Sequence, residues 1–329
     1  LGRFKKRFRG PMLFIYGSND PETRAAAANY TRFCADAGIP SEFNVMVVIP
    51  SLLKNEAELA SLLHQLENHY LGNADPNVRF ALLTDFVDAQ QKELPGETDL
   101  IQKAKSGIEQ LDQRYGGERY HPFYLFHRER IWNPNEGCWM GWERKRGKLV
   151  EFNSLLSGKE RSAFTVQSGD LSVLPATRYV VTLDADTTMP RDCVRQLAGI
   201  LAHPLNQAEF DPETGTLTDG YTVIQPRVQV RPSVANHSIF TRIYSGDVTL
   251  DLYTRAISDV YQDLFGEGNY IGKGIYDVAA FERCLADRVP DNTLLSHDLF
   301  EGIYGCCGLA TNIILYEDYP THYLTYANR

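Results

Sequence analysis

Short apolar runs recur along the chain from residue 44 onwards, and each ends at proline or at polar side chains. They are rich in β-branched, aromatic and leucine residues without polar alternation, which is typical of strands buried on both faces. The predicted strands are 44–50, 80–83, 122–126, 179–183, 221–226 and 312–316. Pro50 is expected to halt the first of them, because proline breaks a strand's hydrogen-bond ladder.

Between these runs, apolar side chains recur at helical spacing. Leu59, Leu62 and Leu66 mark the first helix, and Asn55 with Glu58 resembles the capping box that begins one. Further helices are predicted over 100–111, 193–201 and 233–265, with a hairpin within 206–220. This alternation of strands and helices predicts an α/β fold, and its first strand, loop and helix suit a nucleotide-binding domain.

The run at 179–183 ends in two carboxylates, Asp184 and Asp186. Positions i and i+2 of an extended chain point the same way, so both side chains are expected to project from the strand's tip. Ligands of open α/β sheets bind beyond the carboxyl ends of strands, and paired carboxylates suit Mg²⁺ or Mn²⁺ carrying a diphosphate. The alternative is that the pair caps a helix beginning at Pro190. Asp85 follows the run at 80–83 in the same way.

A cluster of cations, Arg144, Lys145, Arg146 and Lys148, follows the chain's three tryptophans. Such a cluster is usually a solvated face. Lys and Arg also make charge-assisted hydrogen bonds to phosphate oxygens, so one or two of these cations are expected to clamp a diphosphate.

The loop at 265–274 is rich in glycine but has neither the Walker A nor the dinucleotide spacing, and it follows a predicted helix rather than a strand. Glycine there allows the backbone to approach a ligand such as a sugar chain closely. A structural turn is the alternative.

Composition and charge narrow the possible partners. The 329 residues carry a net charge of −9, which argues against a nucleic-acid binder. The six cysteines are scattered and suit a reducing compartment. No apolar run is long enough for a membrane span, and no secretory signal is seen. The basic start, 1–10, suits the cytoplasmic edge of a membrane helix or a disordered tail.

Several segments together resemble the glycosyltransferase domain of the cyclic β-1,2-glucan synthases, over most of residues 44–326. The resemblance implies a GT-A nucleotide-diphospho-sugar transferase fold, with a mixed, mostly parallel sheet flanked by helices. It also implies inverting transfer from UDP-glucose to a β-1,2-glucan acceptor, and Mg²⁺ or Mn²⁺ as cofactor. The matching segments are 48–53, 80–85, 139–153, 183–187, 265–276 and 295–302.

The same resemblance assigns roles to individual residues. It implies Asp298 as the general base, Asp184 and Asp186 as metal ligands, and Asp85 as a nucleotide contact. The complete nucleotide-sugar set is Pro50, Asp85, Lys148, Asn153, Asp184 and Asp186. The expected acceptor contacts are Gly272, Lys273, Gly274, His297 and Trp142. Trp132 and Trp139 are further candidates for holding the glucan, with core packing as the alternative.

One departure from the pattern concerns the end of the chain. In related transferases, an arginine-tryptophan motif comes after the general base along the chain. The given sequence ends, at residues 326–329, before such a motif. We therefore expect an excised domain of a larger membrane enzyme, with residues 1–43 as a juxtamembrane lead-in and 44–329 as the transferase domain. The expected location is the cytoplasmic face of a bacterial inner membrane, reached through flanking segments, and the isolated domain is expected to make little glucan.

Two other functions remain open at this level. A glycoside hydrolase or phosphorylase also uses paired carboxylates, but these need not stand at D-x-D spacing on one strand. A module that binds a nucleotide sugar or glucan without turnover would retain the same aspartates. Binding of UDP that depends on Mn²⁺ would exclude the hydrolase or phosphorylase.

Overall fold

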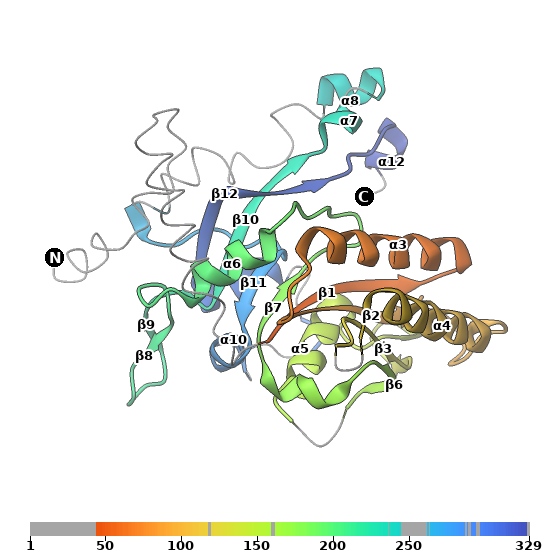
Figure 1. Cartoon of the computed structure of the whole chain (residues 1–329), viewed down its shortest axis with the longest axis horizontal. Coiled ribbons are helices and arrows are strands. Elements are labelled where there is room, and N and C mark those ends of the chain that lie inside the picture. The colour runs from red at the N-terminus through yellow and green to blue at the C-terminus, as the bar shows by residue number, and fades with distance from the viewer. Residues whose placement is uncertain are drawn as a thin grey trace. The chain divides into compact units, whose positions relative to one another are not determined.

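A computed structural model describes residues 44–117, 120–158, 162–235, 237–244, 262, 264–286, 288, 291–293 and 297–327 (Figure 1). The predicted lead-in at 1–43 lies outside the described residues. The chain forms two compact units, which are described separately. Among the described residues, the first unit comprises those up to Ala185 together with those of 276–297, and the second comprises those of 186–275 and those from 298 onwards.

The sheet of the first unit confirms the predicted α/β class. Its strands run in the order β7-β1-β2-β3-β6, and β7, β1, β2 and β3 are parallel while β6 is antiparallel to β3. The bounds are β1 Asn44–Leu53, β2 Val78–Phe86, β3 Phe123–Arg128, β6 Phe164–Ser168 and β7 Thr177–Thr182. The residues of 45–49, 80–83 and 123–126 are buried, as expected for strands covered on both faces.

Helices connect the parallel strands of this unit. The helix α3 begins after Asn55, whose side chain accepts a hydrogen bond of 2.9 Å from the backbone N–H of Glu58, as the capping pattern predicts. It packs against β2 and beside α4, and the two helices run side by side in Figure 1. The bounds are α3 Glu56–Asn73, α4 Glu97–Tyr115, α5 Arg144–Leu156, the 3₁₀ helix η2 Leu171–Ala176 and α10 Val278–Leu285.

The prediction that Pro50 ends the first strand is wrong, because β1 continues to Leu53. β7 pairs with β1 only as far as Val48, whereas β2 pairs along the whole remaining length. Beyond Val48, β1 therefore has no paired strand on the side of β7. Pro50 lies in this part of β1, where the backbone N–H that proline lacks is not needed for pairing.

The second unit contains β10 and β12, which pair in parallel, with α6 packed against both. The short strands β8 and β9 form the predicted hairpin. The bounds are α6 Cys193–Ala202, β8 Glu209–Phe210, β9 Leu217–Asp219, β10 Val223–Val230, α11 Asp298–Gly305, β12 Cys307–Glu317 and α12 Tyr323–Ala327. β11, Gly274–Asp277, contains the residues where the chain passes from this unit to the first.

The helix predicted over 233–265 is interrupted where it is described: α7 Pro232–Ala235 and α8 Ile239–Tyr244 are two short helices, and residues 262, 264 and 265 are helical as well. Residues 245–261 lie outside the described part of the chain. Among the described residues, no helix is long and apolar enough to span a membrane. The cysteines in that part of the chain form no disulfide.

Candidate functional site

A cavity of about 700 Å³ opens in the first unit where β1 and β2 end and α5 begins. The carboxyl ends of neighbouring parallel strands meet at one edge of a sheet, so this is where a ligand site is expected. The lining residues from the two strand ends are Pro50, Ser51, Leu52, Lys54, Asp85, Phe86, Val87 and Asp88. The remaining lining residues are Glu58, Ser61, Leu62, Gly141, Arg144, Lys145, Lys148 and Ala185.

Asp85 lies at the base of this cavity and is only 2% exposed. Arg128, on the neighbouring strand β3, donates two hydrogen bonds of 2.8 Å to its two carboxylate oxygens. Lys148 Nζ lies 3.2 Å from Asp85 Oδ2. A Cβ atom on Gly141 would lie 2.4 Å from Asp85 Oδ2, so a glycine is required for this approach. These contacts hold Asp85 rigidly. Arg128 Nε uses one lone pair of Oδ1, so this oxygen can accept a second hydrogen bond.

The sequence predicts that Lys148 contacts the nucleotide sugar. In the structure its side chain is buried and contacts other groups of the protein. Its Nζ donates a hydrogen bond of 2.7 Å to the carbonyl oxygen of Ser51 as well as approaching Asp85. Burial lowers the pKa of Lys148, and the charge of Asp85 opposes that shift. Lys148 therefore ties the end of β1 to the end of β2 and contributes to the wall of the cavity.

Arg144 and Lys145 are more exposed than Lys148 and stand at the start of α5. Glu143 and Arg144 have φ angles of 50° and 48°, a left-handed conformation that is rare for residues other than glycine. Strain of this kind persists where the surroundings fix it, often at ligand sites. Lys145 Nζ donates a hydrogen bond of 2.5 Å to Asp184 Oδ1, which joins the cation cluster to the first aspartate of the D-x-D pair.

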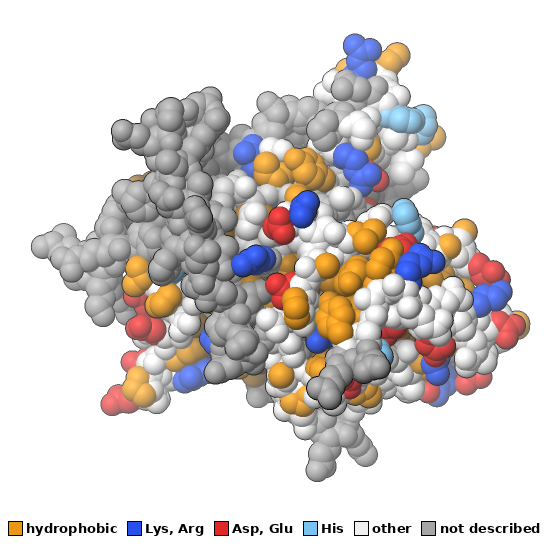
Figure 2. All heavy atoms as spheres, viewed as in Figure 1, with side chains coloured by type: hydrophobic (Ala, Val, Ile, Leu, Met, Phe, Trp, Pro, Cys, Tyr) orange, Lys and Arg blue, Asp and Glu red, His pale blue; other side chains and the backbone are white. Residues whose placement is uncertain are grey.

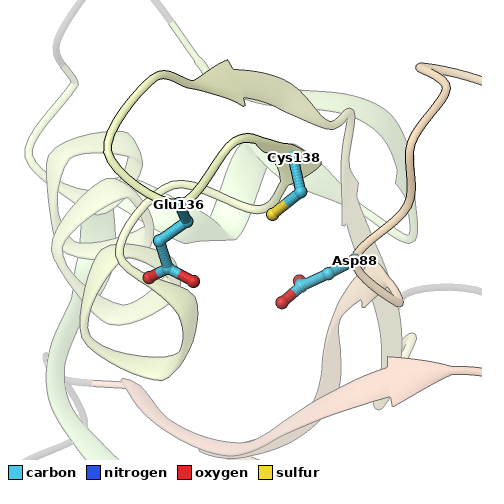
Figure 3. Close-up of side chains that lie close together, drawn as sticks. All are labelled: Asp88, Glu136 and Cys138. Atoms are coloured by element: carbon cyan, nitrogen blue, oxygen red, sulfur yellow. The ribbon is translucent and has the colours of Figure 1, made fainter.

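A second acidic group lies at the rim of the cavity. Asp88, Glu136 and Cys138 have ligand atoms within 4.8 Å of one another, and their side chains point into one space (Figure 3). Arg144 Nη2 already donates to Asp88 Oδ2 at 2.9 Å and to Glu136 Oε2 at 2.7 Å. The guanidinium supplies the positive charge that these carboxylates need, so the group is an ion-pair network.

His127 is buried on β3 next to Arg128. Its Nδ1 lies 3.0 Å from Thr84 Oγ1, and its ring packs edge-on against Phe86 with centroids 4.4 Å apart. Burial lowers the pKa of His127 to about 4, so the ring is neutral near pH 7. It supports the strand ends below the cavity without adding charge.

In the second unit, the predicted base and the glycine-rich loop meet. Asp298 is the first residue of α11, and a Cβ on Gly272 would lie 2.4 Å from Asp298 Oδ1. Gly272 has a φ of +77°, so both its conformation and its contact require glycine. A carboxylate oxygen of Glu301 lies within 4.8 Å of one of Asp298.

The same unit places the predicted Lys273 and Asp186 close to Glu317. Lys273 forms an ion pair with Glu317, and Thr187 Oγ1 donates to Glu317 Oε1 at 3.1 Å. Carboxylate oxygens of Asp186 and Glu317 lie within 4.8 Å of each other. Two hard oxygen donors at that separation suit a divalent cation such as Mg²⁺ or Mn²⁺. β7 ends at Thr182, so Asp184 and Asp186 belong to the loop after it and not to the strand itself.

Several predicted residues are placed away from the cavity. Asn153 is buried on α5, where its Oδ1 accepts a hydrogen bond of 2.9 Å from the Tyr276 hydroxyl. Trp142 has Arg146 over its ring at 5.7 Å and does not line the cavity. A Cβ on Gly274 would lie 2.2 Å from the Ile224 carbonyl oxygen, which indicates a packing role. His297 directly precedes α11.

Sequence reasoning missed Arg128 and Glu317. Each lies at or just beyond the end of a predicted strand, 122–126 or 312–316, and each is a charged residue that is buried. A search for charged residues just after every predicted strand would have found both.

On the side of the molecule drawn in Figure 2, the Lys and Arg side chains of the described residues are scattered in small groups, several of them near acidic side chains. That distribution does not resemble the broad basic face of a nucleic-acid binder.

Comparison with known proteins gives one clear relationship. No protein-family model matches the chain. Over 287 residues, 87% of the chain, it is 43% identical to a Rhizobium meliloti (strain 1021) protein described as "Cyclic beta-(1,2)-glucan synthase NdvB". The matched region is 10% of that protein's length.

A solved structure described as "Trehalose-6-phosphate from E. coli bound with UDP-2-fluoro glucose" aligns with 60% of this chain and 32% of its own, at 9% identity. Its TM-score of 0.22 is too low to define the fold. The sequence match confirms the predicted resemblance, and this chain is related to the cyclic β-1,2-glucan synthases through a segment about a tenth as long as NdvB.

Proposed function

We propose that this chain is a glycosyltransferase domain that transfers glucose from UDP-glucose to a growing β-1,2-glucan with inversion at the anomeric carbon. The observation that supports this proposal most strongly is the cavity at the ends of β1 and β2, which is lined by the buried Asp85 and by the cations Arg144 and Lys145. The relationship to NdvB supports the choice of sugar and linkage. We further propose a GT-A type of fold, in which a nucleotide occupies this position.

In the proposed site, a carboxylate binds the nucleoside of the donor and two cations bind its diphosphate. Asp85 accepts a hydrogen bond from the nucleoside through Oδ1, because Arg128 and Lys148 fix its carboxylate in place. Arg144 and Lys145 exchange their present carboxylate partners for diphosphate oxygens, with which they form charge-assisted hydrogen bonds. A cavity of about 700 Å³ falls within the range usual for small-molecule ligands.

Asp184 and Asp186 are the proposed ligands of Mg²⁺ or Mn²⁺, with Glu317 as a further candidate. The carboxylates of Asp186 and Glu317 fit such an ion by their type and by their separation of less than 4.8 Å. When bound, the cation would neutralise negative charge that develops on the departing UDP. Lys273, paired with Glu317, offsets part of the negative charge of this group.

Asp298 is the proposed general base. It takes the proton from the acceptor hydroxyl, which then attacks the anomeric carbon from the side opposite to UDP. Asp298 is the first residue of α11. Gly272 packs directly against this carboxylate, and a side chain at position 272 would collide with Oδ1.

The proposed setting is the cytoplasmic face of a bacterial inner membrane, with attachment through parts of a longer protein. This rests on the relationship to a much longer synthase and on the basic segment at 1–10.

Calorimetry with UDP, with and without Mn²⁺, tests the proposal. We expect binding that strengthens with Mn²⁺ and weakens in Lys145→Ala. Lys103→Ala is a matched control, because Lys103 lies on α4 in an exposed ion pair with Glu56 and does not line the cavity. Absence of UDP binding under both conditions would exclude the proposal.

A further inference from the structure

A buried arginine lies beside the loop of residues 87–96, which follows β2. Arg130 stands between β3 and the short strand β4, Ile131–Asn133, and its side chain is fully buried. Its guanidinium carbon lies 5.1 Å from the centre of the Phe86 ring. A buried guanidinium is stable only where its donors find acceptors, so the partners of Arg130 indicate what it holds in place.

The guanidinium binds three points of the chain. Nε donates a hydrogen bond of 2.6 Å to the carbonyl oxygen of Val87, and Nη1 donates one of 3.0 Å to that of Lys92. Nη1 and Nη2 also donate to the two carboxylate oxygens of Glu97, the first residue of α4. Glu97 Oε2 in turn accepts a hydrogen bond of 2.8 Å from the backbone N–H of Leu94. Arg130 thus joins the end of β2, the middle of the loop and the start of α4.

The start of this loop forms one wall of the cavity. Phe86, Val87 and Asp88 line the cavity directly after Asp85. Asp88 Oδ2 also accepts a hydrogen bond of 2.9 Å from Arg144, one of the two cations proposed to bind the diphosphate. The backbone that Arg130 holds at Val87 therefore connects the residue proposed to bind the nucleoside with a partner of the diphosphate cations.

Hydrogen bonds rather than burial keep this loop in place, because residues 90–96 are exposed. Ala89 exchanges two backbone hydrogen bonds of 2.9 Å and 2.8 Å with Trp139, on the short strand β5, Cys138–Met140. Arg130 binds one carbonyl oxygen before Ala89 and one after it. Its hydrogen bonds are charge-assisted and shielded from water, which makes them stronger than ordinary backbone hydrogen bonds.

We propose that Arg130 is a positioning residue of the proposed donor site. It acts through Val87, whose backbone it fixes, and so keeps the wall between Asp85 and Asp88 in its binding shape before a nucleotide arrives. A wall that is already ordered costs the ligand less free energy to bind. The identity of the ligand, a uridine nucleotide, rests on the proposed function, whereas the attachment of the loop rests on the hydrogen bonds of Arg130.

Variants of Arg130 test this role by calorimetry with UDP in Mn²⁺. Arg130→Met removes all the donors, and it should weaken UDP binding by about tenfold, because the wall then has to be ordered on binding. Arg130→Lys should recover part of the affinity, since one ammonium cannot reach three points as the planar guanidinium does. Arg130→Met combined with Glu97→Gln leaves no unpaired carboxylate behind, and it should show the same weakening as Arg130→Met.

Arg79→Met is the matched control. Arg79 is also buried, donates to the carbonyl oxygens of Pro76 and Val78, and lies over the ring of Tyr120 at 4.6 Å. It stands at the start of β2, however, whereas the cavity lies at the end of that strand. Arg79→Met should therefore lower stability as a buried arginine variant does, and leave UDP affinity unchanged.

Proteolysis tests the same coupling in the unmutated chain. Trypsin cuts after Lys92 only when the carbonyl oxygen of Lys92 leaves Arg130, because the protease has to bind that oxygen itself. If the wall and the nucleotide are coupled, saturating UDP should slow this cut several-fold, since coupling between a binding site and a local opening is reciprocal. Arg130→Met should speed the cut, and Arg79→Met should not.

The outcomes separate this inference from the proposed function. If UDP binds to the unmutated chain and Arg130→Met weakens it no more than Arg79→Met does, the positioning role is wrong and the proposed function stands. A cut after Lys92 that bound UDP does not slow would also overturn the positioning role. If the unmutated chain does not bind UDP, the proposed function fails and the positioning role fails with it.

Discussion

Arg128 holds Asp85 by two parallel hydrogen bonds, from Nε to Oδ1 and from Nη2 to Oδ2, each 2.8 Å long. Both side chains are buried, so neither charge is shared with solvent. Arg128 also contacts Glu151 and the carbonyl oxygen of Arg144. This pair therefore links the strand ends below the cavity to the first turn of α5.

Arg128→Gln should be strongly destabilising. It leaves the buried Asp85 with Lys148 alone, and removing one partner of a buried ion pair costs about 3–5 kcal/mol. Urea unfolding measures the loss. Arg114→Gln is the control, since its pair with Glu67 lies at the surface, and it should lose far less stability. Equal losses of stability in the two variants would show that the buried pair of Arg128 and Asp85 contributes no more to stability than a surface ion pair does.

Asp186→Ala should remove most of the metal dependence of UDP binding. Loss of a carboxylate ligand is expected to weaken Mn²⁺ binding by at least about tenfold, because even outer groups of metal sites have effects of this size. Calorimetry with UDP at several Mn²⁺ concentrations gives the dependence. Glu213→Ala, an exposed carboxylate in a turn of the same unit, is the control. If the unmutated chain binds UDP equally well in EDTA and in Mn²⁺, the metal proposal is wrong.

Asp298→Asn, made in the full-length enzyme, should leave UDP-glucose binding nearly intact and slow glucan elongation by about 10²–10⁴-fold. The amide retains the shape of the carboxylate but cannot accept the proton of the acceptor hydroxyl. Elongation is followed by mass spectrometry of the oligosaccharides, and donor binding by calorimetry. A rate close to that of the unmutated enzyme would place the base elsewhere, and Glu301 would be the next residue to test because of its proximity to Asp298.

Stability should fall as the pH is lowered, partly through His127. Its pKa is about 4 in the folded chain against 6.5 for an ordinary histidine, because burial disfavours the charged ring. Above pH 6.5 the ring is neutral in both states and adds no pH dependence. Between pH 6.5 and 4 only the unfolded state takes up the proton, which costs about 3 kcal/mol in total.

His127→Asn should therefore show a shallower loss of unfolding free energy over pH 6.5 to 4 than the unmutated chain. Asn is chosen because its side chain can still bond to Thr84 Oγ1. His64→Asn, at an exposed position on α3, should keep the original slope. Identical slopes for all three proteins would show that His127 does not titrate differently in the two states.

The hydrophobic pattern predicted β1, β2, β3, β7, α3 and α4 of the first unit, but it did not predict α5 or β6. Runs such as 80–83 and 122–126 are buried on both faces, so they leave no ambiguity about which side faces the core. The capping residue Asn55 placed the start of α3 correctly. The pattern failed at Pro50, because the tolerance of a strand for proline depends on where its neighbour ends, which sequence spacing does not reveal.

The candidate site was less predictable. The sequence predicts Asp85 from its place at a strand end and Lys145 from its place in a cluster of cations, but the partners of both residues lie far away along the chain. Nothing in the spacing of 85 and 128 indicates that adjacent strands bring them together. Lys148 and Asn153 stand on the same helix as Arg144, and whether such residues face solvent, cavity or core depends on how α5 is oriented on the sheet.

The missing side chain at Gly141 has a consequence for how this site can change during evolution. Because a Cβ at position 141 would lie 2.4 Å from Asp85 Oδ2 and 3.0 Å from Arg128 Nη2, the three positions constrain one another. A side chain could be gained at 141 only together with a smaller residue at 85 or a rearrangement of 128. Among relatives of this chain, the three positions should therefore covary. A sequence with alanine at 141 and an unchanged aspartate and arginine at the other two would mark a lineage in which the end of β2 has been remodelled.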